Sequence, residues 1–140
     1  PITDLPQNEV LIKVRYSSVN FKDTMSAIGN KGVTQKIPHV PGIDAVGEVV
    51  TSSNSKFKTG DHVIVTGYDL GMNTWGGFGE YISVPSAWVV ALHEELSPLE
   101  AMSYGTAGLT AGLSVYHLIR SGIKPEDGKV VVSGATDRLG

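Results

Sequence analysis

Short apolar runs separated by glycine and proline fill this chain from residue 10 to about residue 92. Residues 10–16 (VLIKVRY) alternate apolar and polar side chains, which predicts a strand with one buried face. Four later runs predict further strands, at residues 43–50, 62–66, 80–84 and 88–92. Many short strands joined by glycine and proline turns indicate a compact β barrel or sandwich, and this pattern constrains the fold most.

The pattern changes at Ser97. The run Ser97-Pro98-Leu99-Glu100 combines an N-cap serine, a proline at the first helical position and a glutamate at the third, which predicts the start of a helix. Residues 106–121 predict a second helix with apolar positions near one face, and residues 129–133 predict a further strand. The chain therefore reads as β-rich to about residue 96 and as α/β afterwards.

Three segments between the strands differ in character. Residues 20–28 predict a short helix that Gly29 ends, and residues 29–40 predict an exposed polar loop. Residues 67–79 contain five glycines with aromatic residues between them. We expect this stretch to be a long loop that is free to shape a ligand site.

Composition excludes several classes of protein. The 140 residues suffice for about one domain with a core of its own, and the net charge of −3 without a Lys/Arg cluster argues against nucleic acid as a partner. No apolar run approaches a membrane span, and the first residues show no signal-peptide pattern. The absence of cysteine excludes disulfides and thiolate-bound zinc, and the four dispersed histidines have no ligand spacing. We expect a soluble, cytoplasmic protein without a metal site.

Both ends suggest that the sequence is part of a longer one. Pro1 is not an initiator methionine, and the predicted strand 129–133 runs into a glycine turn, which usually opens a βαβ unit. Because a strand needs neighbours, we expect the sheet to continue beyond Gly140. The alternative is a short edge strand that ends the fold.

Six motifs occur in order along the chain: residues 16–23 (YSSVNFKD), 41–44 (PGID), 60–61 (GD), 75–81 (WGGFGEY), 104–108 (YGTAG) and 130–135 (VVVSGA). With them the sequence resembles the zinc-independent branch of the medium-chain dehydrogenases/reductases, in particular the acryloyl-CoA reductase and quinone-oxidoreductase-like group. The resemblance implies a mixed β and α/β fold: a GroES-like β-barrel catalytic domain over residues 1–104, and the connecting helix and first strand of a truncated Rossmann domain over residues 105–140.

The resemblance also implies a function. Members of the group use NADPH to reduce an activated carbon–carbon double bond of an enoyl thioester such as acryloyl-CoA. The alternatives are quinone reduction by NADPH and a GroES-like binding module without catalysis, since fold does not fix function. The implied partners are a small-molecule substrate and, for the full-length protein, a second copy in a homodimer. We expect the 140-residue chain alone to be inactive.

Reduction of an enoyl thioester requires a donor to the developing enolate oxygen and a proton source. Asn20 could offer an amide donor, and Asp23 is a second candidate catalytic residue whose alternative role is to cap the helix. Tyr68, Asn73 and Trp75 lie on the glycine-rich loop, where they could shape a substrate pocket or simply pack the loop.

Cofactor contacts are implied by the resemblance for Phe21 and Thr106, and in the glycine turn for Gly134, Ala135 and Gly140. Core packing is the alternative for Phe21, and helix capping is the alternative for Thr106. The turn departs from the pattern of the group, because Asp137 and Arg138 stand where glycines let the pyrophosphate approach the backbone. A tolerated variant, a disabling mutation and a junction with a later segment would each explain this departure.

Overall fold

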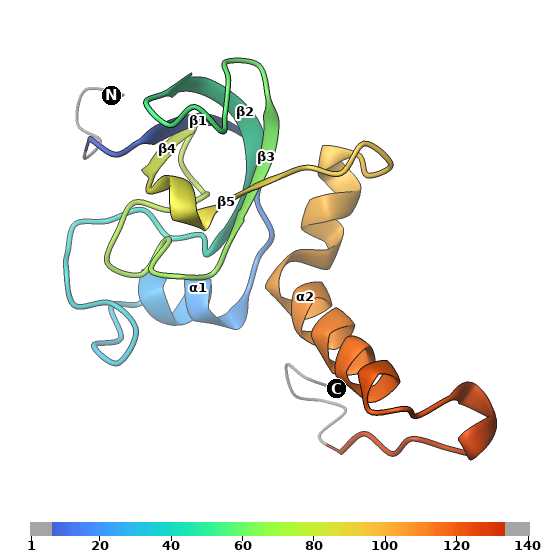
Figure 1. Ribbon diagram of the computed structural model, residues 1–140. Helices are drawn as coiled ribbons and strands as arrows, with labels where there is room; N and C mark the ends of the chain where they lie inside the picture. Colours follow the sequence, from blue (N-terminus) through green and yellow to red (C-terminus); the bar gives the residue numbers. More distant parts are fainter. Residues whose placement is uncertain (1–6, 134–140) are drawn as a thin grey trace. The chain divides into compact units, whose positions relative to one another are not determined.

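The structure is a computed structural model that describes residues 7–133. It divides into a first unit, Pro1–Gly105, and a second unit, Thr106–Gly140. The first unit contains a five-stranded antiparallel sheet in the order β4-β1-β2-β3-β5 (Figure 1). The strands are β1 Val10–Tyr16, β2 Asp44–Ser52, β3 His62–Thr66, β4 Tyr81–Val84 and β5 Val89–Ala91.

The predicted strands are all present in the first unit. β1 and β3 have the predicted bounds, whereas a 3-10 turn, Ser86–Trp88, precedes β5 and takes up the tryptophan expected to begin that strand. The pairing of β1 with β2 shifts register twice, between Leu11 and Ile12 and between Val14 and Tyr16. Such irregularities bend a strand and increase its twist, so they help the sheet to curl.

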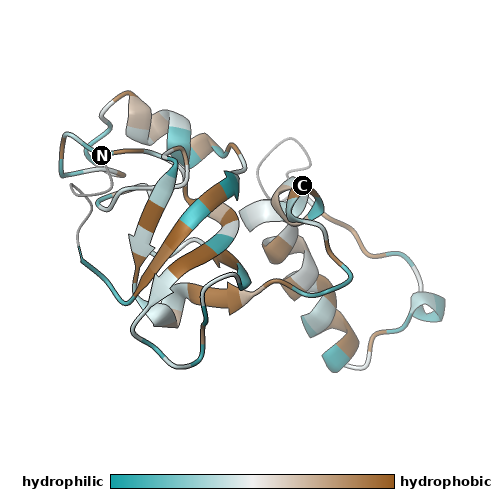
Figure 2. Ribbon diagram, turned by 90° about the horizontal axis from the view of Figure 1, so that it is seen from above, coloured by the Kyte–Doolittle hydropathy of each residue, from teal (hydrophilic) through white to brown (hydrophobic). Residues whose placement is uncertain are grey.

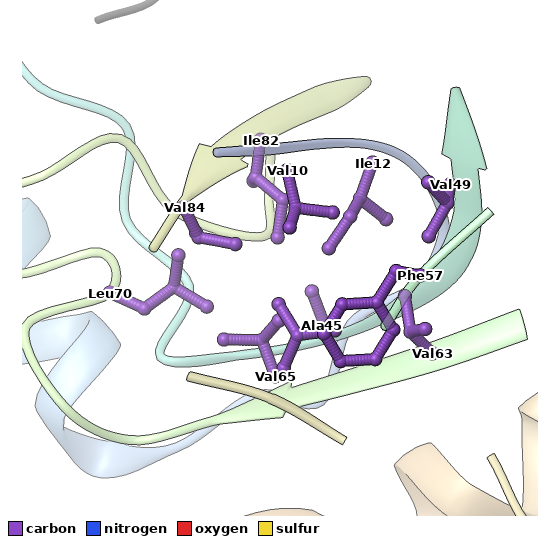
Figure 3. Close-up of a cluster of buried hydrophobic side chains, with 11 residues drawn as sticks. Val10, Ile12, Ala45, Val49, Phe57, Val63, Val65, Leu70, Ile82 and Val84 are labelled. Atoms are coloured by element: carbon purple, nitrogen blue, oxygen red, sulfur yellow. The ribbon is translucent and has the colours of Figure 1, made fainter. Parts of the chain in front are cut away.

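The alternating pattern of the strands places one face inside the curled sheet. Figure 2 shows apolar and polar segments alternating along the strands. The inward side chains come from all five strands and from two loop residues, Phe57 and Leu70, and they form one buried cluster (Figure 3). Val10 and Ile12 of β1 point toward Ala45 of β2 and Val65 of β3 across this core. Burial of these apolar side chains stabilises the frame on which the site residues are held.

Two helices accompany the sheet. Helix α1, Phe21–Ala27, lies between β1 and β2 in the chain, close to the predicted bounds. Helix α2 spans Pro98–Arg120 and begins with the predicted capping box: the Glu100 carboxylate accepts from the Ser97 hydroxyl at 2.6 Å and from the Ser97 N–H at 2.9 Å. No helix within residues 7–133 is both long enough and apolar enough to cross a membrane.

Helix α2 is interrupted at Gly105, where φ is 51° and ψ is −153°. These angles lie in a region that is essentially restricted to glycine. The two helices predicted from the sequence are therefore the two parts of α2 on either side of this kink, and the boundary between the units follows Gly105.

The second unit contains the rest of α2 and a short 3-10 turn, Pro125–Asp127. Residues 129–133 form no strand in the part of the chain that the structure describes, which corrects the prediction made from their sequence. Val131 is 89% exposed, and Val130 and Val132 are also exposed. The physical reason is that a strand is stable only when its backbone pairs with a neighbour, and sequence pattern cannot supply that neighbour.

Candidate active site

The segments 17–23 and 41–44 lie side by side because of the pairing between β1 and β2. The two strands are antiparallel, and Tyr16 at the end of β1 is paired with Val46 near the start of β2. The residues that follow β1 and the residues that precede β2 are therefore brought together at one end of the sheet. Two motifs separated by about 20 residues in sequence thus form one site.

A buried carboxylate from the first segment holds the backbone of the second. Asp23 is only 1% exposed, and its Oδ1 accepts from the N–H groups of Gly42 at 3.1 Å and Ile43 at 2.9 Å. Its Oδ2 accepts from the N–H of Asn20 at 2.7 Å. Helix capping, the alternative considered for Asp23, is therefore present together with a tie to the neighbouring segment, and a catalytic role for Asp23 stays a prediction.

A second buried carboxylate, from the second segment, accepts hydrogen bonds from the first segment. Asp44 is fully buried at the start of β2, and its Oδ2 accepts from the Ser18 hydroxyl at 2.6 Å and from the Asn20 side-chain amide at 2.9 Å. The Ser17 hydroxyl donates to the Asp44 carbonyl at 2.6 Å. Each segment thus contributes one buried carboxylate that receives donors from the other segment. This pair of contacts, the reciprocal clasp of Asp23 and Asp44, fixes the geometry of the site.

The clasp positions two residues predicted for the site, Asn20 and Phe21. Asn20 is the N-cap of α1, and its side chain is partly exposed. Phe21 follows at the first helical position with 60% of its surface exposed, so core packing does not account for this aromatic side chain. The structure thus presents an amide and an aromatic ring on consecutive residues of a rigid frame.

The glycine-rich loop packs its backbone directly on the second segment. Gly76 donates to the Val40 carbonyl at 2.7 Å, Gly77 to the Gly42 carbonyl at 2.8 Å and Phe78 to the Pro41 carbonyl at 3.0 Å. A Cβ on Gly42 would lie 2.7 Å from two backbone nitrogens of this loop, and Gly42 has a φ of 110°. The later part of the loop is therefore fixed rather than free, which corrects the expectation drawn from its glycine content.

The three loop residues predicted for a substrate pocket have different surroundings. The Tyr68 ring is 60% exposed and stacks on Trp88 with centroids 5.3 Å apart, and its backbone has a φ of 54°. The Asn73 side chain accepts from the Gln35 N–H at 2.8 Å and donates to Asp69 at 3.1 Å, so it ties two loops together. Trp75 is partly buried. Loop packing explains the contacts of Tyr68 and Asn73, and their contact with substrate stays a prediction.

Ser26 of α1 contacts His39, and both residues border a cavity of about 340 Å³. The Ser26 hydroxyl contacts the Thr34 hydroxyl at 2.6 Å, the Gly71 carbonyl at 3.0 Å and His39 Nε2. Ser26 has one hydrogen, and the carbonyl can only accept it, so all three contacts are satisfied when Thr34 and His39 donate. Ser26 then donates away from His39. The cluster links α1 to two loops.

The predicted cofactor residues are divided between the two units. Thr106 is the first residue after the kink in α2, and its carbonyl accepts from the Thr110 hydroxyl at 2.9 Å. Gly134, Ala135 and Gly140 lie outside the described residues, as do Asp137 and Arg138. Their proposed roles stay predictions.

Sequence reasoning did not assign Ser18 and Asp44 to the site, although both lie in the motifs that carried the resemblance. One signal could have identified Asp44: a carboxylate near the start of the predicted apolar strand 43–50 would be buried and would require hydrogen-bond donors. Ser18 and Asn20 precede it by two dozen residues and are neutral donors. Among residues 7–133, no three His, Asp or Glu side chains gather in a way that could hold a metal ion.

The chain is similar in sequence to known oxidoreductases and to a known family of domains. The family pattern described as the alcohol dehydrogenase GroES-like domain matches residues 6–94. The chain is 49% identical over 137 residues to YhfP of Bacillus subtilis, which is named as a quinone oxidoreductase; the match covers 98% of this chain and 42% of YhfP. It is 44% identical over 139 residues to the acrylyl-CoA reductase AcuI of Ruegeria pomeroyi, covering 99% of this chain and 42% of AcuI.

Solved structures give the same result. The yhdH oxidoreductase of Salmonella enterica, determined in complex with NADP, superposes with a TM-score of 0.92 at 42% identity, over 96% of this chain and 42% of that one. YhfP, determined with NAD bound, superposes with a TM-score of 0.91 at 48% identity, over 99% of this chain and 42% of that one. The chain thus spans about two fifths of the length of these relatives.

The resemblance predicted from the six motifs is confirmed by these matches. The chain belongs to the alcohol dehydrogenase GroES-like domain family, within the medium-chain dehydrogenases/reductases that include its acrylyl-CoA reductase and quinone oxidoreductase relatives.

Proposed function

We propose that this chain provides the substrate side of the active site of an NADPH-dependent oxidoreductase that reduces the activated double bond of an enoyl thioester such as acryloyl-CoA. The observation that carries the proposal is the reciprocal clasp, which holds Asn20 and Phe21 on adjacent positions of a rigid frame. The similarity to AcuI supports the thioester as substrate, and the NADP complex of yhdH supports the cofactor.

The residues at the head of α1 suit a nicotinamide by their chemistry. Phe21 offers an exposed ring surface on which a planar heterocycle could stack, and Asn20 offers an amide for its polar groups. When bound, the nicotinamide would supply the hydride. The chain itself would hold the reactants in register, since a preorganised frame lowers the cost of orientation.

Turnover by the full-length protein tests this proposal. Loss of NADPH absorbance that depends on acryloyl-CoA is the expected result, and no substrate-dependent loss would refute thioester reduction. The 140-residue chain should be inactive by itself, because it spans only about two fifths of the length of its oxidoreductase relatives. Tight binding of NADPH to the isolated chain in a calorimeter would contradict this expectation.

Quinone reduction is the second candidate, favoured by the 49% identity to YhfP. The same positioning of a nicotinamide would serve a planar quinone, which needs no thioester-binding surface. Parallel assays with a simple quinone and with acryloyl-CoA, at equal NADPH, separate the two candidates. If the protein turned over the quinone faster than acryloyl-CoA at all concentrations, the quinone would become the proposed substrate in place of the thioester.

A further inference from the structure

One carboxylate of the reciprocal clasp, that of Asp44, accepts a hydrogen bond from a side chain of the proposed site. Asp23 receives three backbone N–H groups, whereas Asp44 Oδ2 receives the side chains of Ser18 and Asn20. A contact with backbone secures the fold. A contact with the Asn20 amide also determines which end of that amide faces outward.

The orientation of the Asn20 amide follows from hydrogen-bond chemistry. The Asn20 nitrogen lies 2.9 Å from Asp44 Oδ2, which already accepts the Ser18 hydrogen at 2.6 Å. If the amide were turned over, its oxygen would face an oxygen that acts as an acceptor, with no hydrogen between them. The amide nitrogen therefore faces Asp44, and the amide oxygen faces away from it.

The amide oxygen of Asn20 is available to a ligand. This oxygen lies on the side of the amide that is turned away from Asp44, and the Asn20 side chain is partly exposed. One N–H of the amide is committed to Asp44. The side of the amide that faces away from Asp44 thus carries the oxygen, an acceptor, which differs from the donor role expected for Asn20 from the sequence.

The surroundings leave Asp44 little room to move. A Cβ on Gly105 would lie 2.5 Å from Ser18 Oγ and 2.8 Å from Asp44 Oδ2, so the backbone of α2 passes directly against this pair. Asp44 is fully buried, and its own carbonyl is held by Ser17. The carboxylate is therefore a fixed reference point for the side chains that donate to it.

We propose that Asp44 is a positioning residue that fixes the Asn20 amide with its nitrogen inward and its oxygen outward, so that Asn20 meets the bound ligand as an acceptor for an N–H or O–H group. This inference rests on the proposed function for its ligand. The orientation of the amide does not depend on that function. The competing explanation is that Asp44 only stabilises the fold.

The first test measures the amide itself in the full-length protein without ligand. The side-chain ¹⁵N–¹H signals of Asn20, assigned by their loss in Asn20→Ala, should show one proton protected from solvent exchange. Asp44→Ala should abolish this protection and Ser18→Ala should leave it in place. Rapid exchange of both protons in the unmodified protein would overturn the proposal. This result needs no variant at position 44, so it remains decisive if Asp44→Ala fails to fold.

The second test is a double-mutant cycle on turnover. Asp44→Ala should lower kcat by about 10- to 100-fold, since small displacements of a site group have effects of this size. In an Asn20→Ala background the same change should lower kcat by less than about 3-fold, because a positioning residue acts through the group that it positions. If Asp44→Ala lowered kcat by the same factor in the unmodified protein and in the Asn20→Ala background, a positioning role for Asp44 would be refuted.

Ser52→Ala is the matched control in the cycle. It removes the 2.9 Å hydrogen bond from the Ser52 hydroxyl to the Asn54 carbonyl, and Ser52 ends the strand β2 that Asp44 begins, so it lies outside the site. Its thermal stability should fall while kcat stays within about 3-fold. A kcat loss as large as that of Asp44→Ala would favour the purely structural explanation. If the unmodified protein reduces neither thioester nor quinone, the proposed function fails, and the amide signals still decide the orientation.

Discussion

Removal of the Asp23 carboxylate should be among the most destabilising single substitutions in the first unit. Asp23→Ala leaves the N–H groups of Gly42 and Ile43 without acceptors, and both residues are buried. Each buried unsatisfied donor costs about 1–3 kcal/mol, which gives about 2–6 kcal/mol for the pair. The third donor, Asn20 N–H, lies at a helix start on a partly exposed residue, so its loss adds about 1 kcal/mol.

The expected loss, about 3–7 kcal/mol, is a large share of the ~5–15 kcal/mol that stabilises an ordinary domain. Asp23→Asn should cost less. Its amide oxygen can keep the two donors at Oδ1, while its nitrogen would face only the Asn20 N–H. Asp61→Ala is the matched control, because the Asp61 carboxylate also accepts from a backbone N–H, that of Lys58 at 2.7 Å, but in an exposed position.

Urea unfolding measures these differences through the fluorescence of Trp75 and Trp88, which are the two tryptophans of the chain and both lie in the first unit. The free energy of unfolding should fall least for Asp61→Ala, by no more than about 1.5 kcal/mol, more for Asp23→Asn and most for Asp23→Ala. If Asp23→Ala cost no more than Asp61→Ala, the inference that the clasp secures the two segments would be wrong.

Three further predictions concern α2 and the head of α1. Gly105→Ala should lower the unfolding free energy by at least about 1–3 kcal/mol, because of the positive φ and the clash with Ser18. Gly112→Ala on the same helix, where a Cβ meets open space, should instead raise the unfolding free energy by about 0.5–1 kcal/mol. Thermal unfolding of both variants shows whether one substitution destabilises and the other stabilises. The hydrogen bonds from the Ser97 hydroxyl and then the Ser97 N–H hold the pKa of Glu100 below its ordinary value, so their stabilisation is present at neutral pH and is lost as the pH falls through that lowered pKa. Glu100→Gln should therefore show a smaller loss of Tm on acidification below about pH 4, and identical acid profiles would contradict this. Phe21→Ala should raise the Kd of the full-length protein for NADPH by about 2- to 10-fold in calorimetry, with little change in stability, since the ring is exposed. Ile28→Ala, which truncates another exposed residue just past the end of α1, should leave this Kd unchanged.

The local elements could be predicted from the sequence because their signals are local. Strand alternation over residues 10–16 and the serine–glutamate pair at positions 97 and 100 each specify a structure within a few residues. The six motifs also indicated the family. The prediction of a strand at residues 129–133 was wrong because its signal was only local. A strand also needs a neighbouring strand to pair with, and the local pattern does not specify that neighbour.

The candidate site depended on contacts that only the tertiary structure decides. The sequence by itself determined that Asn20, Asp23 and Asp44 were present, and that Asp23 could cap a helix. It could not determine that Asp23 reaches Gly42 and Ile43, or that Asp44 takes the Asn20 amide nitrogen. These contacts arise because antiparallel pairing of β1 with β2 brings distant segments together, and buried carboxylates then require whichever donors lie nearby.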